Sequence, residues 1–223
     1  MNDKLPPLEV RVWGDFACFT RPEMKVERVS YDVPTPSAAR GILAAIFQKP
    51  EFDFLIREIH VLKPISYFCL TRNEVKNKAS YQSAKKARSS FLIEEQRTQR
   101  HSLILRDVAY IIKADQRLRP GVNEDIAKYR DQFRRRVNKG QCFWRPYLGC
   151  REFSAFFGPP EEGDQAIPVS TPLGFTLFDL LFEDEGKDRG TGTPIFFQAE
   201  LERGVLKVPE ALYSQTLKNK RSR

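Results

Sequence analysis

The chain has 223 residues, 41% of them apolar, which is enough for one large or two small domains with a sizeable core. Lys and Arg number 37 against 29 Asp and Glu, and the net charge of +8 favours a polyanionic partner such as nucleic acid. The sequence has neither the apolar run of a signal peptide nor the ~20 apolar residues of a membrane span. Its four cysteines form no C-x-x-C pair, so we expect free thiols and no metal site. Together these features predict a cytoplasmic protein without a membrane partner or a cofactor.

The first elements are predicted from periodicity and from capping signals. Residues 8 to 13, LEVRVW, alternate apolar and polar positions, which is typical of a half-buried strand. A helix then begins with Thr35 as N-cap and Pro36 at its first position, and it ends before Pro50. Residues 56 to 71 are rich in β-branched and aromatic side chains and predict a strand that is interrupted by a proline.

The middle of the chain carries a long basic stretch. Residues 72 to 100 lack a clear period and predict a loop or a long hairpin excursion, and residues 102 to 112 predict a further strand. Asn123 then caps a helix over residues 123 to 138, where apolar residues recur every three or four positions. A strand at 151 to 157 completes the order β-α-β-β-α-β, which is that of a ferredoxin-like domain.

The C-terminal part lacks helical signals. Beyond Pro159, the stretches GFTLFDLLF, PIFFQAEL and GVLKV predict short strands separated by charged or Gly-containing turns. We therefore predict an α+β fold, with a ferredoxin-like (RRM-like, RAMP-type) RNA-binding domain over residues 1–158 that carries an extended β-hairpin. A small, mostly β region is expected over residues 159–223.

The segment FTRPEMKVERVSYDVPTPSAARG, residues 19 to 41, mixes cations with aromatic rings. Guanidinium and ammonium groups neutralise phosphates and flat rings stack on bases, so this mixture suits single-stranded nucleic acid. The segment also leads to a helix N-terminus that could receive an anion. An ordinary charged surface hairpin explains the composition equally well. The candidate RNA-binding residues here are Arg21, Lys25, Arg28 and Arg40, around Phe19 and Tyr31.

The helix at 123 to 138 carries five cations away from its apolar stripe, and they could follow a phosphate backbone. Solvated charge, partly offset by Asp125 and Asp131, is the alternative. Arg134 and Arg136 are the favoured phosphate contacts.

Cleavage of RNA without a metal requires proton transfer to and from the reacting oxygens, and a histidine can supply it because imidazole exchanges protons near neutral pH. His60 lies in the alternating REIHVLK and is more simply a strand residue. His101 follows Arg100 where the basic excursion meets a strand, a better place for an accessible base beside a cation. On the residues alone, a surface histidine without a catalytic role is the commoner explanation. Walker, G-x-G-x-x-G and G-x-S-x-G motifs are absent, and the spacing of the aspartates supports no particular metal-dependent nuclease site.

Four stretches resemble the CRISPR-associated Cas-five proteins of the type I-C (Dvulg) subtype, across most of residues 8 to 183. They are VWGDFACFTRPEMKVERVSYDVPTPSAARGIL, KPISYFCLTRNEV, LILRDVAY and KYRDQFRRRVNKGQCFWRPYLGCREFSAFF. The resemblance implies a RAMP-type ferredoxin-like domain and an endoribonuclease that cuts the repeat hairpin of CRISPR precursor RNA without a metal. It also implies that the protein then holds the 5′ handle beside the backbone and large subunits of an interference complex, and meets target DNA only within that complex.

The catalytic site of this subtype is described as a tyrosine, a lysine and a histidine. The position of the tyrosine corresponds to Phe47, so either another tyrosine, such as Tyr31 or Tyr81, takes that role or the role is not essential. The nearest match to the remaining pair is Arg100 with His101, which assigns proton transfer to the histidine and charge stabilisation to the arginine. Two alternatives stay open: a noncatalytic subunit that caps the 5′ handle, and a protein that binds duplex DNA.

Overall fold

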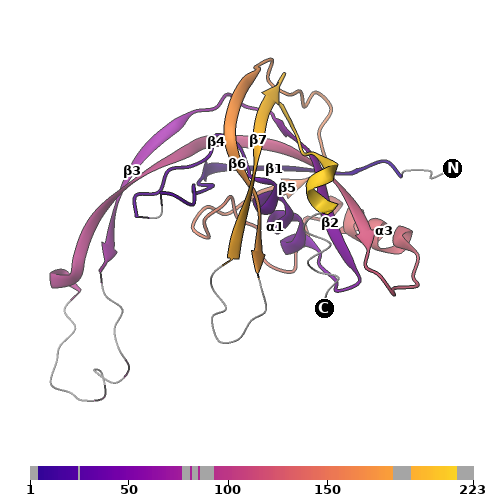
Figure 1. Ribbon diagram of the computed structural model, residues 1–223, viewed down its shortest axis with the longest axis horizontal. Helices are drawn as coiled ribbons and strands as arrows, with labels where there is room; N and C mark the ends of the chain where they lie inside the picture. The colour runs from indigo at the N-terminus through magenta and orange to yellow at the C-terminus, as the bar shows by residue number, and fades with distance from the viewer. Residues whose placement is uncertain are drawn as a thin grey trace.

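The computed structural model describes residues 5–24, 26–76, 81, 85, 93–182 and 192–214. A large, mostly antiparallel sheet dominates the fold, and few helices accompany it (Figure 1). The strands are β1 (Leu8–Ala17), β2 (Phe52–Val61), β3 (Tyr67–Val75), β4 (Arg97–Leu118), β5 (Phe156–Gly158), β6 (Thr171–Phe182), β7 (Gly192–Glu202) and β8 (Val205–Lys207). The helices are α1 (Pro36–Ile46) and α3 (Ile126–Asn138), with a 3₁₀ turn at Glu94–Gln96 and a short helical segment at 210–214.

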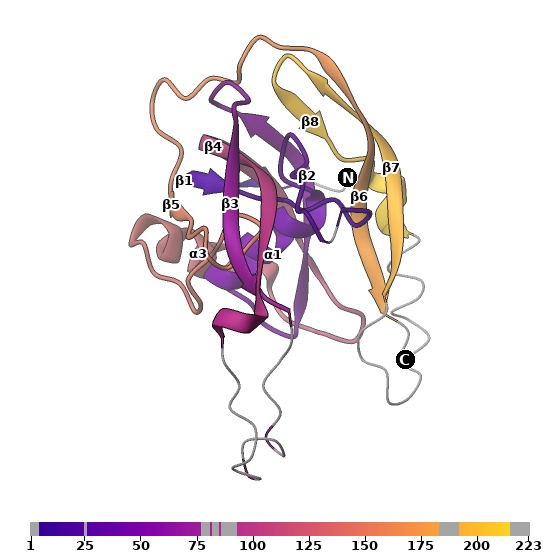
Figure 2. The ribbon, with the colours of Figure 1, turned by 90° about the vertical axis from the view of Figure 1, so that its left-hand side faces the viewer.

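The sheet order is β5-β1-β4-β2-β8-β7-β6, and β3 pairs with β4 beside this path. The C-terminal half of β4 lies between β1 and β2, whereas its N-terminal half pairs with β3 from Leu105 to Arg97. Figure 1 shows the resulting two-stranded ribbon extending away from the body of the sheet, and Figure 2 shows its two strands side by side. The sequence predicted a strand only over 102–112, and the real strand is 22 residues long. The rest of the predicted excursion, apart from residues 81 and 85, lies between 77 and 92, outside the described residues.

Helices α1 and α3 pack on one face of the sheet. The ring of Phe54 lies 5.3 Å from that of Phe133 in α3, and the ring of Phe52, on the same face of β2, lies 5.6 Å from that of Phe47. As predicted, Thr35 caps α1, with its hydroxyl accepting a hydrogen bond from the Ala38 N–H at 3.2 Å. These contacts form the centre of the hydrophobic core.

Two further element boundaries and one expected binding property differ from the sequence-based prediction. Helix α3 begins at Ile126, because Asp125 rather than Asn123 accepts the N-terminal hydrogen bond, from the Ala127 N–H at 2.8 Å. Strand β5 is shorter than predicted, since the Phe153 N–H donates to the Cys150 carbonyl in a turn. The helix N-terminus of α1 offers no open anion site, because Thr35 is only 5% exposed and fills it.

The predicted C-terminal strands are present as β6, β7 and β8. Strand β8 pairs with β2 through Glu58, Ile59 and His60, so the C-terminal strands continue the same sheet. The division of the chain at residue 158 stays a prediction. No helix within the described ranges is long and apolar enough to cross a membrane.

Candidate functional site

The ribbon of β3 and β4 has two chemically different faces. Side chains alternate between the faces of a strand, and the register pairs Thr71 with His101 and Arg72 with Arg100. One face is exposed and the other half-buried. The exposed face carries Thr71, Asn73, Gln99 and His101, and the half-buried face carries Arg72, Glu74, Arg100 and Ser102.

His101 is exposed and has a fixed orientation. Its Nδ1 lies 3.0 Å from the Thr71 hydroxyl oxygen, so Nε2 is the nitrogen that can exchange a proton with a bound molecule. When Nδ1–H donates to the hydroxyl, Nε2 of the neutral ring can accept a proton and acts as a base. The protonated ring keeps the same hydrogen bond and acts as an acid through Nε2–H. Thr71 was missed in the sequence because residues 72–100 read as a loop and concealed the pairing.

The predicted Arg100–His101 pair does not form. Because neighbours in a strand point to opposite faces, Arg100 turns away from His101. Its Nε lies 3.4 Å from a Glu74 carboxylate oxygen, and its Nη1 donates to the Val26 carbonyl at 3.4 Å. Adjacency in sequence therefore does not place a cation on the face that carries the histidine.

Arg100 instead belongs to a group of five charged side chains that we call the Arg–Glu cluster. Its members are Arg28, Arg72, Arg100, Glu74 and Glu152. Arg28 lies 3.2 Å from Glu152 and 3.8 Å from Glu74, and Arg72 also pairs with Glu152. The cluster brings together β3, β4, the segment after β1 and the loop after α3. Glu152 lies 124 positions from Arg28, so no local pattern could have predicted their contact.

Backbone pairing fixes Arg28 in this cluster. The Leu103 N–H donates to the Arg28 carbonyl at 2.8 Å, and the Ser30 N–H donates to the Leu103 carbonyl at 2.9 Å. Partial burial opposes ionisation of Glu152, but its own backbone N–H, Arg72 and Arg28 outweigh burial and lower the pKa of the carboxyl. The Glu152 carboxyl is therefore ionised at neutral pH.

Two thiols lie beside the cluster. The hydrogen bond with Cys18 lowers the pKa of Cys150 to about 6, against the effect of burial, with further help from Thr20 and Arg28. The same hydrogen bond, together with burial, raises the pKa of Cys18. Arg28 Nη1 donates to the Cys150 sulfur at 3.5 Å. Cys150 is thus the more acidic thiol of the pair.

Tyr31, predicted as a catalytic tyrosine, is a core residue in this structure. It is 2% exposed, burial raises the pKa of its hydroxyl, and the guanidinium of Arg21 lies 4.4 Å from its ring centroid. Arg21 also lies 3.9 Å from Asp32. The position that corresponds to the tyrosine of the subtype, Phe47, is likewise buried, at 1% exposure. Neither aromatic side chain shares the exposed face of His101.

Two other predicted RNA contacts form structural bonds. Both guanidinium nitrogens of Arg40 pair with the carboxylate of Asp179 in β6, and the Nη2 bond is 2.6 Å long. Arg136 donates to the Ile46 carbonyl at 3.0 Å and lies 5.2 Å from the ring centroid of Phe47. A cation is favourable at the C-terminal end of a helix, so Arg136 stabilises α1.

The remaining predicted RNA contacts lie elsewhere. Arg134 is exposed on α3 and lies 3.5 Å from Asp131. Helix α3 and the outer part of β3 lie at opposite ends of the molecule (Figure 1). Lys25 lies outside the described residues.

His60 bonds Glu58 at 2.7 Å within β2, which agrees with its interpretation as a strand residue. Within the described ranges, no three His, Cys, Asp or Glu side chains gather closely enough to hold a metal ion.

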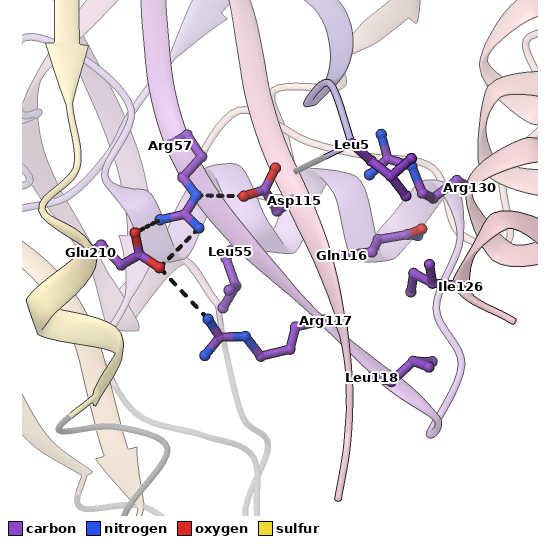
Figure 3. A pocket seen from close by; sticks show the side chains of 10 residues that line it. All are labelled: Leu5, Leu55, Arg57, Asp115, Gln116, Arg117, Leu118, Ile126, Arg130 and Glu210. Carbon is purple, nitrogen blue, oxygen red and sulfur yellow. Dashed lines mark hydrogen bonds and ion pairs between the residues drawn. The ribbon is translucent and has the colours of Figure 1, made fainter. Parts of the chain in front are cut away.

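A pocket of about 450 Å³ lies at the other end of β4 (Figure 3). Arg57 pairs there with Asp115 at 2.6 Å and with Glu210 at 3.1 Å. Gln116 is 8% exposed, and neither atom of its amide has a hydrogen-bond partner in the described part of the chain. The lining residues are Leu5, Leu55, Arg57, Asp115, Gln116, Arg117, Leu118, Ile126, Arg130 and Glu210.

Comparison with known proteins identifies first the fold and then the protein family. A solved crystal structure of a CRISPR-associated protein superposes with a TM-score of 0.64 at 23% identity and covers 91% of both chains, so the two share a fold. This likeness establishes the fold, and the family follows from the sequence. The profile of the Cas5d family, described as CRISPR-associated protein (Cas5), matches residues 7–216. The chain belongs to the Cas5d family.

Two relatives carry a functional name. A protein of Thermus thermophilus is 48% identical over 221 residues, which is 93% of each chain. A protein of Mannheimia succiniciproducens is 44% identical over 228 residues, which is 95% of this chain and 98% of the relative. Both are named CRISPR pre-crRNA endoribonuclease Cas5d.

Proposed function

We propose that this protein is a CRISPR pre-crRNA endoribonuclease. The observation that carries the proposal is the near full-length identity of 48% and 44% to two relatives of that name. The net charge of +8 suits an RNA substrate, and an oriented, exposed His101 suits proton transfer. The substrate is the repeat hairpin of the precursor RNA, and its cleavage releases individual CRISPR RNAs.

The proposed chemistry needs no metal. The 2′-hydroxyl upstream of the scissile phosphate attacks phosphorus, the bond to the 5′-oxygen breaks, and a 2′,3′-cyclic phosphate and a 5′-hydroxyl result. His101 Nε2 accepts the proton of the 2′-hydroxyl or, in the protonated ring, donates one to the leaving oxygen. The hydrogen bond between Nδ1 and the Thr71 hydroxyl fixes the orientation of the ring. Arg100 lies on the opposite face of the ribbon, so its proposed role changes from charge stabilisation at the scissile phosphate to binding of the RNA backbone.

RNA binding is proposed for the segment after β1 and for the Arg–Glu cluster. Arg21 and Arg28 keep 27% and 33% of their side chains exposed, so both can meet phosphates. Arg134 is a secondary contact on α3. Arg40 and Arg136 are left out of this proposal, because their guanidinium groups are held by Asp179 and by a helix terminus.

The proposed architecture is a ferredoxin-like core with an appended β region. The order β5-β1-β4-β2 with α1 and α3 on one face supports it, since it corresponds to a βαββαβ unit whose third strand is lengthened into the ribbon. After cleavage the protein is proposed to keep the 5′ handle and to join the backbone and large subunits of a type I-C complex.

A single gel assay tests the activity. A labelled repeat hairpin is incubated with the protein in EDTA, beside a substrate with a 2′-deoxy substitution at the cut site. We expect cleavage of the first RNA and none of the second. His101→Ala should abolish cleavage, while the matched variant His60→Ala should cut normally. Cleavage that needs added magnesium, or a His101→Ala variant of full activity, would contradict the mechanism.

The alternative is a noncatalytic subunit that binds the 5′ handle. The specific observation in its favour is the buried phenylalanine, Phe47, at the position that corresponds to the tyrosine of the subtype. Such a protein would bind the repeat RNA with strong salt dependence and leave it intact. The same gel separates the two functions, because only the enzyme produces the shorter fragments.

A further inference from the structure

Glu152 occupies an unusual position between two arginines. Arg28 Nη1 and Arg72 Nη1 both bond the same oxygen, Oε1, of this carboxylate, although they come from segments on opposite sides of β4. We infer that Glu152 is a displaceable anion that holds Arg28 and Arg72 ready for an RNA phosphate. This inference rests on the proposed function, because it names the site where the RNA backbone is received.

The two arginines have anchors that do not depend on Glu152. Arg28 also pairs with Glu74, and its backbone carbonyl accepts the bond from Leu103 described above. Arg72 Nη2 donates to the hydroxyl of Ser102 at 3.2 Å, and Ser102 is 2% exposed. Both guanidinium groups therefore stay in place when the carboxylate leaves.

The carboxylate is the group that can leave. Its side chain is 41% exposed, against 33% for Arg28 and 21% for Arg72. It lies in the turn at residues 150–153, and an exposed ion pair of this kind contributes little net stability. The Arg40–Asp179 pair differs, because the Asp179 side chain keeps only 10% exposure and no comparable exchange is open to it.

A phosphate fits the place that Glu152 vacates. Carboxylate and phosphate oxygens are both met by the fork of donors on a guanidinium, and the pair of arginines would give charge-assisted bonds to one phosphodiester. The carboxylate competes with that phosphate, so each RNA molecule must displace it. Glu152 thus weakens binding of arbitrary anions and favours a ligand that makes further contacts along the ribbon.

The test is the affinity of a repeat RNA made uncleavable by 2′-deoxy substitution at the cut site, measured by fluorescence anisotropy. For Glu152→Gln we expect about three- to tenfold tighter binding and a salt dependence steeper by about 0.7 in log–log slope, since one competing charge is removed. A random single strand should gain at least as much, which lowers the selectivity for the repeat. The control is Glu161→Gln, which removes an exposed carboxylate that pairs with Arg11 at 2.6 Å, and it should change affinity less than twofold.

The double variant Arg28→Ala with Arg72→Ala should weaken binding at least tenfold. Unchanged or weaker binding by Glu152→Gln, or an equal gain from Glu161→Gln, would overturn the inference. Glu152→Ala gives a second reading if the glutamine variant folds poorly, and it is expected to tighten binding in the same way. Failure here leaves the proposed activity standing, because cleavage of the normal hairpin by these variants reports on that activity separately.

Discussion

Replacing Arg40 by alanine should destabilise the fold and leave RNA affinity unchanged. The composition of the segment that contains Arg40 predicts a phosphate contact, whereas the structure places its guanidinium on Asp179, which is 7% exposed. The bond joins α1 to β6 and so ties a helix of the N-terminal part to a C-terminal strand. The variant therefore separates a binding role from a structural one at a single side chain.

The size of the effect follows from the charge left behind. Removing one partner of a buried ion pair costs about 3 to 5 kcal/mol, because the other charge stays buried without compensation. The Arg40 side chain is 34% exposed, so water can reach Asp179 once Arg40 is truncated. We therefore expect a smaller loss, of about 2 to 3 kcal/mol in the free energy of unfolding. With a urea m-value of about 2 kcal/mol/M, the unfolding midpoint should fall by about 1 to 1.5 M.

Urea unfolding followed by circular dichroism measures the loss, and anisotropy with repeat RNA measures the affinity of the folded variant. The double variant Arg40→Met with Asp179→Leu removes both charges and should recover most of the stability. The reasoning would be refuted by an Arg40→Ala protein that keeps its midpoint and loses RNA affinity tenfold. That result would return Arg40 to the RNA-binding residues.

Three further predictions concern single positions. Gly149→Ala should lower the free energy of unfolding by more than about 2 kcal/mol, because φ is +85° there and a Cβ would collide with a backbone carbonyl. Gly163→Ala, where φ is +100° but the surrounding space is open, should lower it less in the same urea titration. Gln116→Met should raise the free energy of unfolding by about 1 kcal/mol, since a buried amide without partners in the described ranges is replaced by an apolar chain, and a fall of that size would indicate a bound water or ligand. The rate at which iodoacetamide alkylates Cys150 should rise with pH through a midpoint near 6, because the lowered pKa favours the thiolate above that pH. Mass spectrometry measures the rate, with Cys150→Ser as the blank, and a rate still rising between about pH 8 and 9 would contradict this.

Local signals predicted the elements whose causes are local. Thr35 and Pro36 mark the start of α1 in the sequence, and the same two residues start the helix in the structure. The alternating C-terminal stretches became β6, β7 and β8 for the same reason. Where two capping residues compete, the sequence alone does not decide, and Asp125 rather than Asn123 caps α3.

The site was harder to predict because it depends on one strand boundary. Residues 97–100 are polar and read as a loop, since β4 has no buried residue before Ser102 and so no hydrophobic pattern there. The missed strand also affected the predicted catalytic site. In a loop, Arg100 and His101 can lie side by side, but in a strand they point to opposite faces, and the partner of each is the residue across the ladder.

Correct assignment of that strand would have separated the two residues but would not have revealed the Arg–Glu cluster. The cluster depends on Glu152, which arrives from a turn after α3 and meets Arg28 across 124 positions of the chain. Tertiary contacts of this length carry no periodic signal, so the sequence predicts the charges and the structure decides which charges are already paired. These pairings decide which arginines we propose for RNA binding. Arg40 and Arg136 are held by buried partners, whereas Arg28 and Arg72 share a carboxylate that solvent can reach.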